Sequence, residues 1–359
     1  MELIVRMLSL IDKIGESPYL LLLILLAATH FIRQTFFKNR PPIPASGNII
    51  MAIGLLTLYG LPSYHVNNFV ERVFALELFV LCGYFFMTYL HGYINDIWIL
   101  QRLPDRIAMG TWVSAAAIVA LVIDYYLPLL HGFIIFLGLF SVIMWLFYLG
   151  YLAKEVIFPT VHRQYEKTMS IYFLSVISTQ AVVLLIDGVF GGDVPAHAYQ
   201  LIILFGLFMY MIIFMFGMKH LLQEMINRES VVWHNNNCFY YGAIAITGLT
   251  MINTQVMPAD LIVMSWWWSL MCLLIVESVE IIRGVIRIYS KGVCDGIFVY
   301  DTTQWARNFS IGVFYAFTYQ VYSNAYEQNS ITSFVKIYGH HMIVILLVIE
   351  LLLAVIDRR

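Results

Sequence analysis

The sequence carries little charge for its length. Asp, Glu, Lys and Arg account for 12% of its 359 residues, whereas 61% are hydrophobic, and the mean hydropathy is +0.81. A typical soluble domain has about twice this charged fraction, roughly 25%. The shortage of charge excludes an ordinary soluble domain and predicts an all-α polytopic protein embedded in a lipid bilayer.

Basic tracts and catalytic signatures are also absent. The net charge is -2, and no cluster of Lys and Arg resembles a nucleic-acid-binding patch. The histidines are dispersed, and no HExxH, GxSxG or Walker motif occurs. The four cysteines form no CxxC pair and are interpreted as reduced, packed thiols. We therefore expect no nucleic-acid binding and no enzymatic activity, with no catalytic residue, cofactor or metal site.

Long apolar runs, by contrast, are abundant. Ten of them are long enough to cross a bilayer, which takes about 20 helical residues. They predict ten transmembrane helices arranged as five helical hairpins. The runs are 45–62, 71–94, 108–127, 129–153, 168–190, 197–219, 238–257, 259–282, 304–322 and 335–356.

Basic residues alternate between the connections of these runs. One set of connections holds nearly all of them, and the positive-inside rule places that set in the cytoplasm. Its members are Lys38, Arg40, Arg102, Arg106, Lys154, Arg163, Lys167, Lys219, Arg228, Arg283, Arg287, Lys291, Arg358 and Arg359. The sequence thus predicts a multi-pass protein of the plasma or inner membrane whose ten-helix core begins and ends in the cytoplasm.

An N-terminal extension, residues 1–40, precedes the ten-helix domain, residues 41–359. Its apolar run 18–32 is short, and the segment before it, 3–14, is amphipathic. No clear small-residue cleavage site follows, which argues against a signal peptide. We predict an additional uncleaved hydrophobic helix that either lies in the membrane interface or spans the bilayer.

The odd-numbered and even-numbered runs differ in their content of small residues. Gly, Ala, Ser and Thr fill roughly one position in three of the odd runs but about one in seven of the even runs, and small residues permit close helix approach. The even runs are rich in bulky Leu, Ile, Phe and Met. The pattern predicts five inner, odd-numbered helices around a central pore, with five outer helices around them. Packing of a solid bundle core is the alternative explanation.

Uncharged polar side chains recur on the odd runs. Hydroxyls and amides solvate an ion weakly enough to release it, and they are equally common in interhelical hydrogen bonds. Both interpretations remain open from the sequence. The candidates for a pore lining are Asn48, Thr111, Ser114, Ser178, Thr179, Gln180, Thr247, Asn308 and Ser310.

Five motifs in order give the chain a resemblance to a known family. It resembles the TDT family, which contains the tellurite-resistance protein TehA, C4-dicarboxylate transporters and plant slow anion channels. The likeness spans about residues 45–357 and leaves the N-terminal extension uncovered. The motifs are GTWVS (110–114), STQAVVLL (178–185), YYGAIAITGL (240–249), SWWWSL (265–270) and YDTTQWARNFSIGVF (300–314).

The resemblance implies a homotrimer in which each protomer has its own pore, closed by a phenylalanine of the ninth helix. That residue is Phe309 here, and Ser310 stands where the family often has proline. The implied function is a channel or transporter for small inorganic or organic anions. The alternative is a carrier for a C4-dicarboxylate or for an oxyanion such as tellurite or sulfite, with or without coupling to protons. Without the resemblance, Phe309 is one of 25 phenylalanines that could simply pack a bundle.

Arg307 is the most unusual charge, because it lies about one turn inside the ninth helix. It either attracts anions to a vestibule below Phe309, reaches the headgroups, or pairs with Glu350 of the last helix. Glu77 and Asp187 are candidates for proton coupling, with interhelical or capping roles as alternatives. Glu277, Glu280, Arg283 and Arg287 follow one face of a helix and predict a solvated ion-pair ladder.

Overall fold

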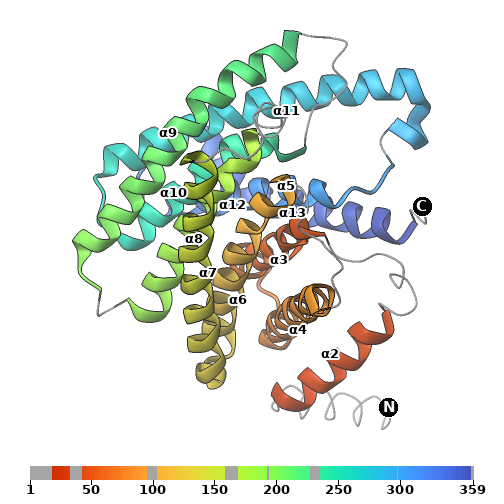
Figure 1. Ribbon diagram of the computed structural model, residues 1–359, viewed down its shortest axis with the longest axis vertical. Coiled ribbons are helices and arrows are strands. Elements are labelled where there is room, and N and C mark those ends of the chain that lie inside the picture. The colour runs from red at the N-terminus through yellow and green to blue at the C-terminus, as the bar shows by residue number, and fades with distance from the viewer. Residues whose placement is uncertain are drawn as a thin grey trace.

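The computed structural model describes residues 18–32, 43–94, 103–157, 169–191, 194–226, 235–296 and 298–356. Within these ranges the regular structure is entirely helical (Figure 1). This confirms the all-α class. Most of the basic residues used to predict topology, and residues 1–17 of the extension, lie outside the described ranges, as does the predicted domain boundary near residue 40.

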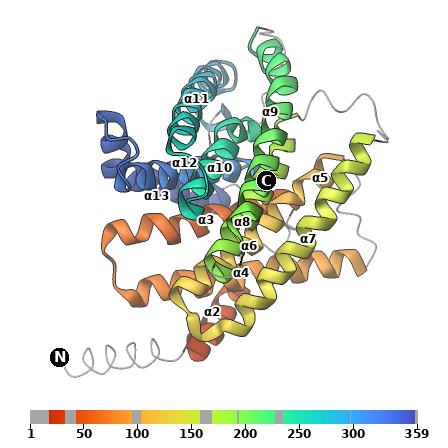
Figure 2. The ribbon, with the colours of Figure 1, turned by 90° about the vertical axis from the view of Figure 1, so that its left-hand side faces the viewer.

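Five hairpins follow one another along the chain. Each hairpin begins with a short helical turn, which leads into the first helix. A longer second helix then runs back in the opposite direction. The pairs are α3 (Gly47–Leu55, continued by a π-helical turn Leu56–Gly60) with α4 (Asn68–Ile94), α6 (Gly110–Tyr126) with α7 (His131–Ile157), α8 (Phe173–Phe190) with α9 (Ala196–Ile226), α10 (Phe239–Thr254) with α11 (Ala259–Gly296), and α12 (Trp305–Ser323) with α13 (Ser330–Ile356). Figure 2 shows the turns of the first and last hairpins on the same side of the molecule.

The five first helices form a closed ring. Each packs against the next in the order α3, α6, α8, α10 and α12, and α12 packs back against α3. They run parallel, because residues near the N-terminal end of one helix contact residues near the N-terminal end of the next, and residues further along contact each other in the same way. Gly242 of α10 lies against Ser310 of α12, and Gly248 lies against Phe317 further along. A Cβ at Gly248 would overlap the Phe317 ring, so the small residues counted in the sequence are what allow this close approach.

The second helices form the outer layer. Each lies against its own inner helix and the next one in the ring, as α7 does against α6 and α8. The contrast in burial is large. In the 18-residue apolar windows of Leu103–Tyr126 and Met169–Phe190, 83% of the residues are buried. In the corresponding windows of Pro128–Glu155 and Ala196–Met218, 22% are buried. The exposed outer faces are apolar, as expected for helices that face lipid, and the predicted inner and outer parity is confirmed.

Eight stretches of the described chain are long and apolar enough to cross a membrane. They correspond to eight of the ten predicted runs. The other two runs form α10 and α12, which complete the ring but are not among the eight. Their sequences contain Gly, Thr, Tyr and Asn, which lower their hydropathy. The chain is therefore a multi-span helical membrane protein, and α10 and α12 belong to its core by packing.

The N-terminal extension contributes one described helix, α2 (Pro18–Ile32), which lies beside α4 (Figure 1). Its apolar stretch Leu22–Phe31 is shorter than any of the eight. The hydroxyl of Thr29 donates a hydrogen bond to Oε1 of Glu77 on α4 at 2.7 Å. Glu77 thus joins α2 to the outer layer and lies away from the ring axis.

Candidate functional site

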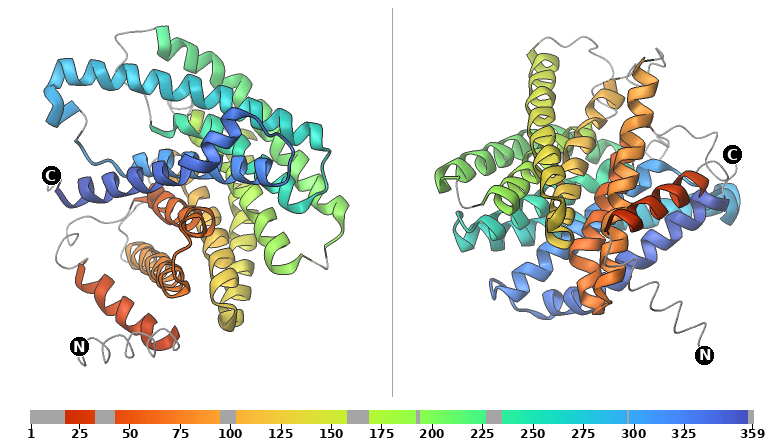
Figure 3. Two further views of the ribbon diagram at one scale, coloured as in Figure 1. Left: turned by 180° about the vertical axis from the view of Figure 1, so that it is seen from behind. Right: turned by 90° about the horizontal axis from the view of Figure 1, so that it is seen from below.

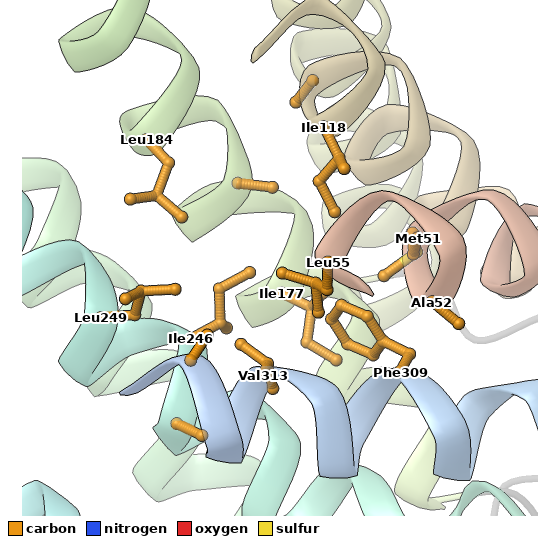
Figure 4. Close-up of a cluster of buried hydrophobic side chains, with 14 of the residues drawn as sticks. Met51, Ala52, Leu55, Ile118, Ile177, Leu184, Ile246, Leu249, Phe309 and Val313 are labelled. Carbon is orange, nitrogen blue, oxygen red and sulfur yellow. The ribbon is translucent and has the colours of Figure 1, made fainter. Parts of the chain in front are cut away.

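The axis of the ring is filled by apolar side chains. Residues from all five inner helices converge there, as Figure 4 shows, and we call them the axial layer. Every inner helix contributes at least one member. The labelled members are Met51, Ala52 and Leu55 of α3, Ile118 of α6, Ile177 and Leu184 of α8, Ile246 and Leu249 of α10, and Phe309 and Val313 of α12.

Phe309 is the largest side chain of this layer and is fully buried. It lies one turn before Val313 on the same face of α12, and its ring points toward Leu55 and Ile177 (Figure 4). α12 is continuous through Ser310. A proline there would have removed a helical hydrogen bond and favoured a kink, so the unbroken helix follows from the serine.

Arg307 lies two residues before Phe309 and is held by α11. Its Nε is 3.5 Å from Oε1 of Glu277, and its Nη2 is 3.3 Å from Oε2 of Glu280. Tyr241 of α10 donates a hydrogen bond to the same Glu277 oxygen at 2.9 Å. The predicted pairing of Arg307 with Glu350 is wrong: the amide nitrogen of Gln304, oriented to satisfy both groups, donates to the Glu350 carboxylate at 2.7 and 3.0 Å.

The row of charges on α11 is also not the solvated ladder that its spacing predicted. Glu280 has a side chain only 8% exposed, and it bridges two arginines, Arg287 of its own helix at 2.6 Å and Arg307 of α12. Figure 3 shows α11 running as a long helix along one side of the molecule. The network therefore ties α11 to α12, and two carboxylates compensate the charge of Arg307.

Most of the polar candidates make ordinary hydrogen bonds. Thr111 donates to the Pro44 and Ala108 carbonyls, while Ser114, Ser178 and Thr247 donate to carbonyls of their own helices. These geometries are those of packed helices, in which a hydroxyl is satisfied by a carbonyl of the preceding turn.

Two of the candidates point toward outer helices. The hydroxyl of Thr179 donates to the Ser175 carbonyl and accepts from the indole of Trp145 on α7 at 3.0 Å. The amide of Gln180 reaches the Ile203 carbonyl on α9 at 3.4 Å and lies against Gly206. Ser310 lies against Gly242 of α10. These three positions are those of interhelical contacts, the alternative that the sequence left open.

Four of the candidates keep a buried polar atom without a partner. Among the described residues these atoms are Oδ1 of Asn48, Oε1 of Gln180, Nδ2 of Asn308 and Oγ of Ser310, and all four side chains are more than nine-tenths buried. Asn48 precedes Met51, Ala52 and Leu55 on one face of α3, and Asn308 precedes Phe309. Buried amides without protein partners require water or another polar group. Asn48 and Asn308 therefore supply unsatisfied hydrogen-bonding groups on the N-terminal side of the axial layer.

The N-terminal ends of the inner helices meet at that same side. The short turns that precede four of them (Pro44–Ser46, Met169–Tyr172, Asn235–Cys238 and Thr302–Gln304) form a second closed ring with α5 (Leu103–Ala108), which precedes α6. The N-terminus of a helix carries a partial positive charge of about half a unit and free N–H groups. Five such ends surround this mouth, and helix N-termini favour an anion.

A cavity of about 220 Å³ lies at the opposite, C-terminal end of the ring. Its floor is the axial layer, through Leu55, Ile118 and Leu184, and its upper wall includes Asp124 of α6 and Asp187 of α8. Asp187 was a predicted site residue, whereas the sequence analysis missed Asp124. The signal was available, because both aspartates stand near the C-terminal ends of odd runs.

Comparison with known proteins adds no relative. No protein-family model matches the sequence, and no curated protein matches it at a significant level. No group of three His, Cys, Asp or Glu side chains that could hold a metal ion occurs within the described ranges.

Proposed function

We propose that this membrane protein passes small anions along the axis of its five-helix ring, through a gate closed by Phe309 and the axial layer. The observation that carries the proposal is the ring itself. Five parallel inner helices direct their N-termini to one mouth, and a single apolar layer separates that mouth from a cavity at the other end.

The helix ends are the source of attraction for an anion. Arg307 is compensated by Glu277 and Glu280, so it contributes little net field at the mouth. Oriented backbone dipoles bind anions at helix N-termini in many proteins, and of these ends the one that leads into α12 is already capped by the Asp301 carboxylate, which accepts from the Thr303 N–H at 2.9 Å. The buried amide of Asn308, one residue before the gate, adds a hydrogen-bond donor without a protein partner in the described chain.

The axial layer supplies the closed state. An apolar constriction stops ions because water leaves it and because no group replaces the hydration shell. The Phe309 ring fills its N-terminal side and lies beside Leu55 of α3 and Ile177 of α8 (Figure 4). Opening requires the ring to move out of the axis, which a rotation about its side-chain bonds achieves without unfolding α12.

Replacement of Phe309 by Ala tests the proposal. Purified F309A protein in liposomes should pass chloride or nitrate at least about tenfold faster than the parent, since the constriction loses its largest ring. The matched control is Phe317→Ala, the same change on the same helix at a buried position packed on Gly248 of α10. A folded F309A protein with the flux of the parent would refute the gate.

A carrier for a C4-dicarboxylate or an oxyanion is the second candidate. One observation favours it, namely a cavity of solute size that is open at one end and closed by the axial layer at the other. Voltage-clamped bilayers distinguish the two, because a channel gives unitary currents with chloride, nitrate or malate, whereas a carrier gives saturable uptake without them. The homotrimer and the cytoplasmic location of both ends remain predictions of the sequence.

A further inference from the structure

The cavity at the C-terminal end of the ring has a charge opposite to that expected for an anion entrance. Its walls come from four of the five inner helices, and two of those helices contribute Asp124 and Asp187. Both side chains are partly exposed, and within the described chain neither forms a salt bridge. The C-terminal ends of the helices add partial negative charge of the same sign.

We propose that Asp124 and Asp187 make this cavity an anion-repelling, cation-attracting vestibule and thereby determine the direction in which anions pass most easily. The directional part rests on the proposed function, whereas the sign of the vestibule does not. Nothing in the sequence resemblance assigns a role to Asp124.

The argument is electrostatic and geometric. A concave site lined by charges of one sign, with low-dielectric walls, focuses their field and changes the local ion concentration. Here the walls and floor are apolar, through Leu55, Ile118 and Ile246, and the carboxylates stand above that floor. An anion approaching from this side meets two uncompensated negative charges before it reaches the axial layer.

The opposite mouth has the reverse character. Five helix N-termini surround it, and its arginine is paired. An anion that enters there is attracted toward the axial layer and is then expelled through the aspartate-lined cavity. With equal solutions on both sides, the anion current should be larger in the direction from the N-terminal mouth to the vestibule, and the difference should grow as salt is diluted.

The sign of the vestibule can be measured without any ion flux. A cysteine at Asn253, which lines the cavity from α10 and belongs to neither aspartate-bearing helix, reports the local potential. The cysteine is reacted with a cationic and with an anionic methanethiosulfonate reagent of similar size. The ratio of the cationic to the anionic reaction rate is then divided by the same ratio for a free thiol in solution. Cys82, Cys238 and Cys272 are buried, and the parent protein measures any background, including that of Cys294.

We expect the cationic reagent to be favoured, and Asp124→Asn with Asp187→Asn to reduce the normalised ratio by at least about fivefold. Asp260→Asn is the matched control, because Asp260 is exposed at the start of α11 and is not a lining residue. A ratio equal to that of the free thiol, or one that the double variant leaves unchanged, would overturn the proposal.

The directional part is measured in the F309A background. Current-voltage curves in symmetric chloride should rectify, and D124N/D187N should abolish the rectification. If F309A carries current that does not rectify, the directional role fails while the proposed function stands. If F309A carries no current but the thiol ratio responds to the aspartates, the proposed function and the directional role fail, and the charged vestibule stands.

Discussion

The two ends of the inner ring differ in whether their charged side chains form salt bridges. At the N-terminal mouth, Arg307 lies beside the gate but is bound between two carboxylates of α11 at 3.5 and 3.3 Å. At the C-terminal mouth, Asp124 and Asp187 line a cavity without a salt bridge in the described chain. The most conspicuous charge of the sequence is therefore compensated, and two inconspicuous ones are not.

This difference shows that the field at a pore mouth follows from pairing and not from residue type. A compensated ion pair acts at a distance as a weak dipole, whereas an unpaired carboxylate in a cavity with apolar walls retains its field. The Arg307 network is thus a structural link between α11 and α12, and under the proposed function the aspartates and helix ends are what an anion would meet.

The largest expected effect concerns the stability of that link. Replacing both Glu277 and Glu280 with Gln leaves Arg307, whose side chain is 20% exposed, without a carboxylate partner. Removing the partner of a buried charge costs about 3–5 kcal/mol. We expect a large fall in the thermal unfolding midpoint in detergent, measured by tryptophan fluorescence.

A third substitution separates lost pairing from general damage. Adding Arg307→Met to the two glutamine substitutions removes the stranded charge, so that no buried cation remains at this position without a partner. The triple variant should recover most of the lost stability. If it is as unstable as the double variant, the ion pairs are not what connects α11 to α12.

Asn308 provides the next largest effect and tests the N-terminal mouth directly. In the F309A background, Asn308→Ala should reduce chloride flux by about tenfold, because a buried donor without a protein partner no longer replaces part of the hydration shell. Asn237→Ala is the comparison, since its amide nitrogen is also unpartnered in the described chain but belongs to the turn before α10. Equal fluxes in both variants and in F309A would place the anion elsewhere.

The architecture could be predicted because it follows from composition and periodicity. Ten apolar runs and their parity in small residues indicated five hairpins with an inner and an outer helix, and close contacts such as Gly248 on Phe317 explain that parity. Close approach requires small side chains wherever two inner helices touch. The requirement holds along whole helices, so it is visible in a single sequence.

Side-chain partners could not be predicted in the same way. Glu350 was one of the alternatives for Arg307 because both belong to one hairpin, but the ring places α11 of the preceding hairpin beside α12. Thr179 and Gln180 were candidates for the pore, yet both point to outer helices. In each case the partner depends on how a side chain is rotated about its helix, which sequence spacing does not determine when a helix is buried on all sides.

Thr179 offers a smaller effect that bears on this distinction. Thr179→Val keeps the shape and removes the acceptor for Trp145, so the free energy of unfolding should fall by about 1 kcal/mol. Anion flux in the F309A background should not change. A loss of flux without a loss of stability would show that the hydroxyl belongs to the path and not to the contact between α8 and α7.

The smallest expected effect is the most direct test of the comparison between the mouths. The triple variant E277Q/E280Q/R307M removes three formal charges beside the gate but, with Arg287 counted, changes the net charge of the network by only one unit, from zero to +1. In the F309A background its chloride conductance should stay within about twofold, because a compensated network contributes little field at the axis. Single-channel recording at low ionic strength, where screening is weakest, gives the test its greatest sensitivity. A conductance that falls severalfold would mean that Arg307 attracts anions despite its partners, and the N-terminal mouth would then owe its character to a side chain and not to the helix ends.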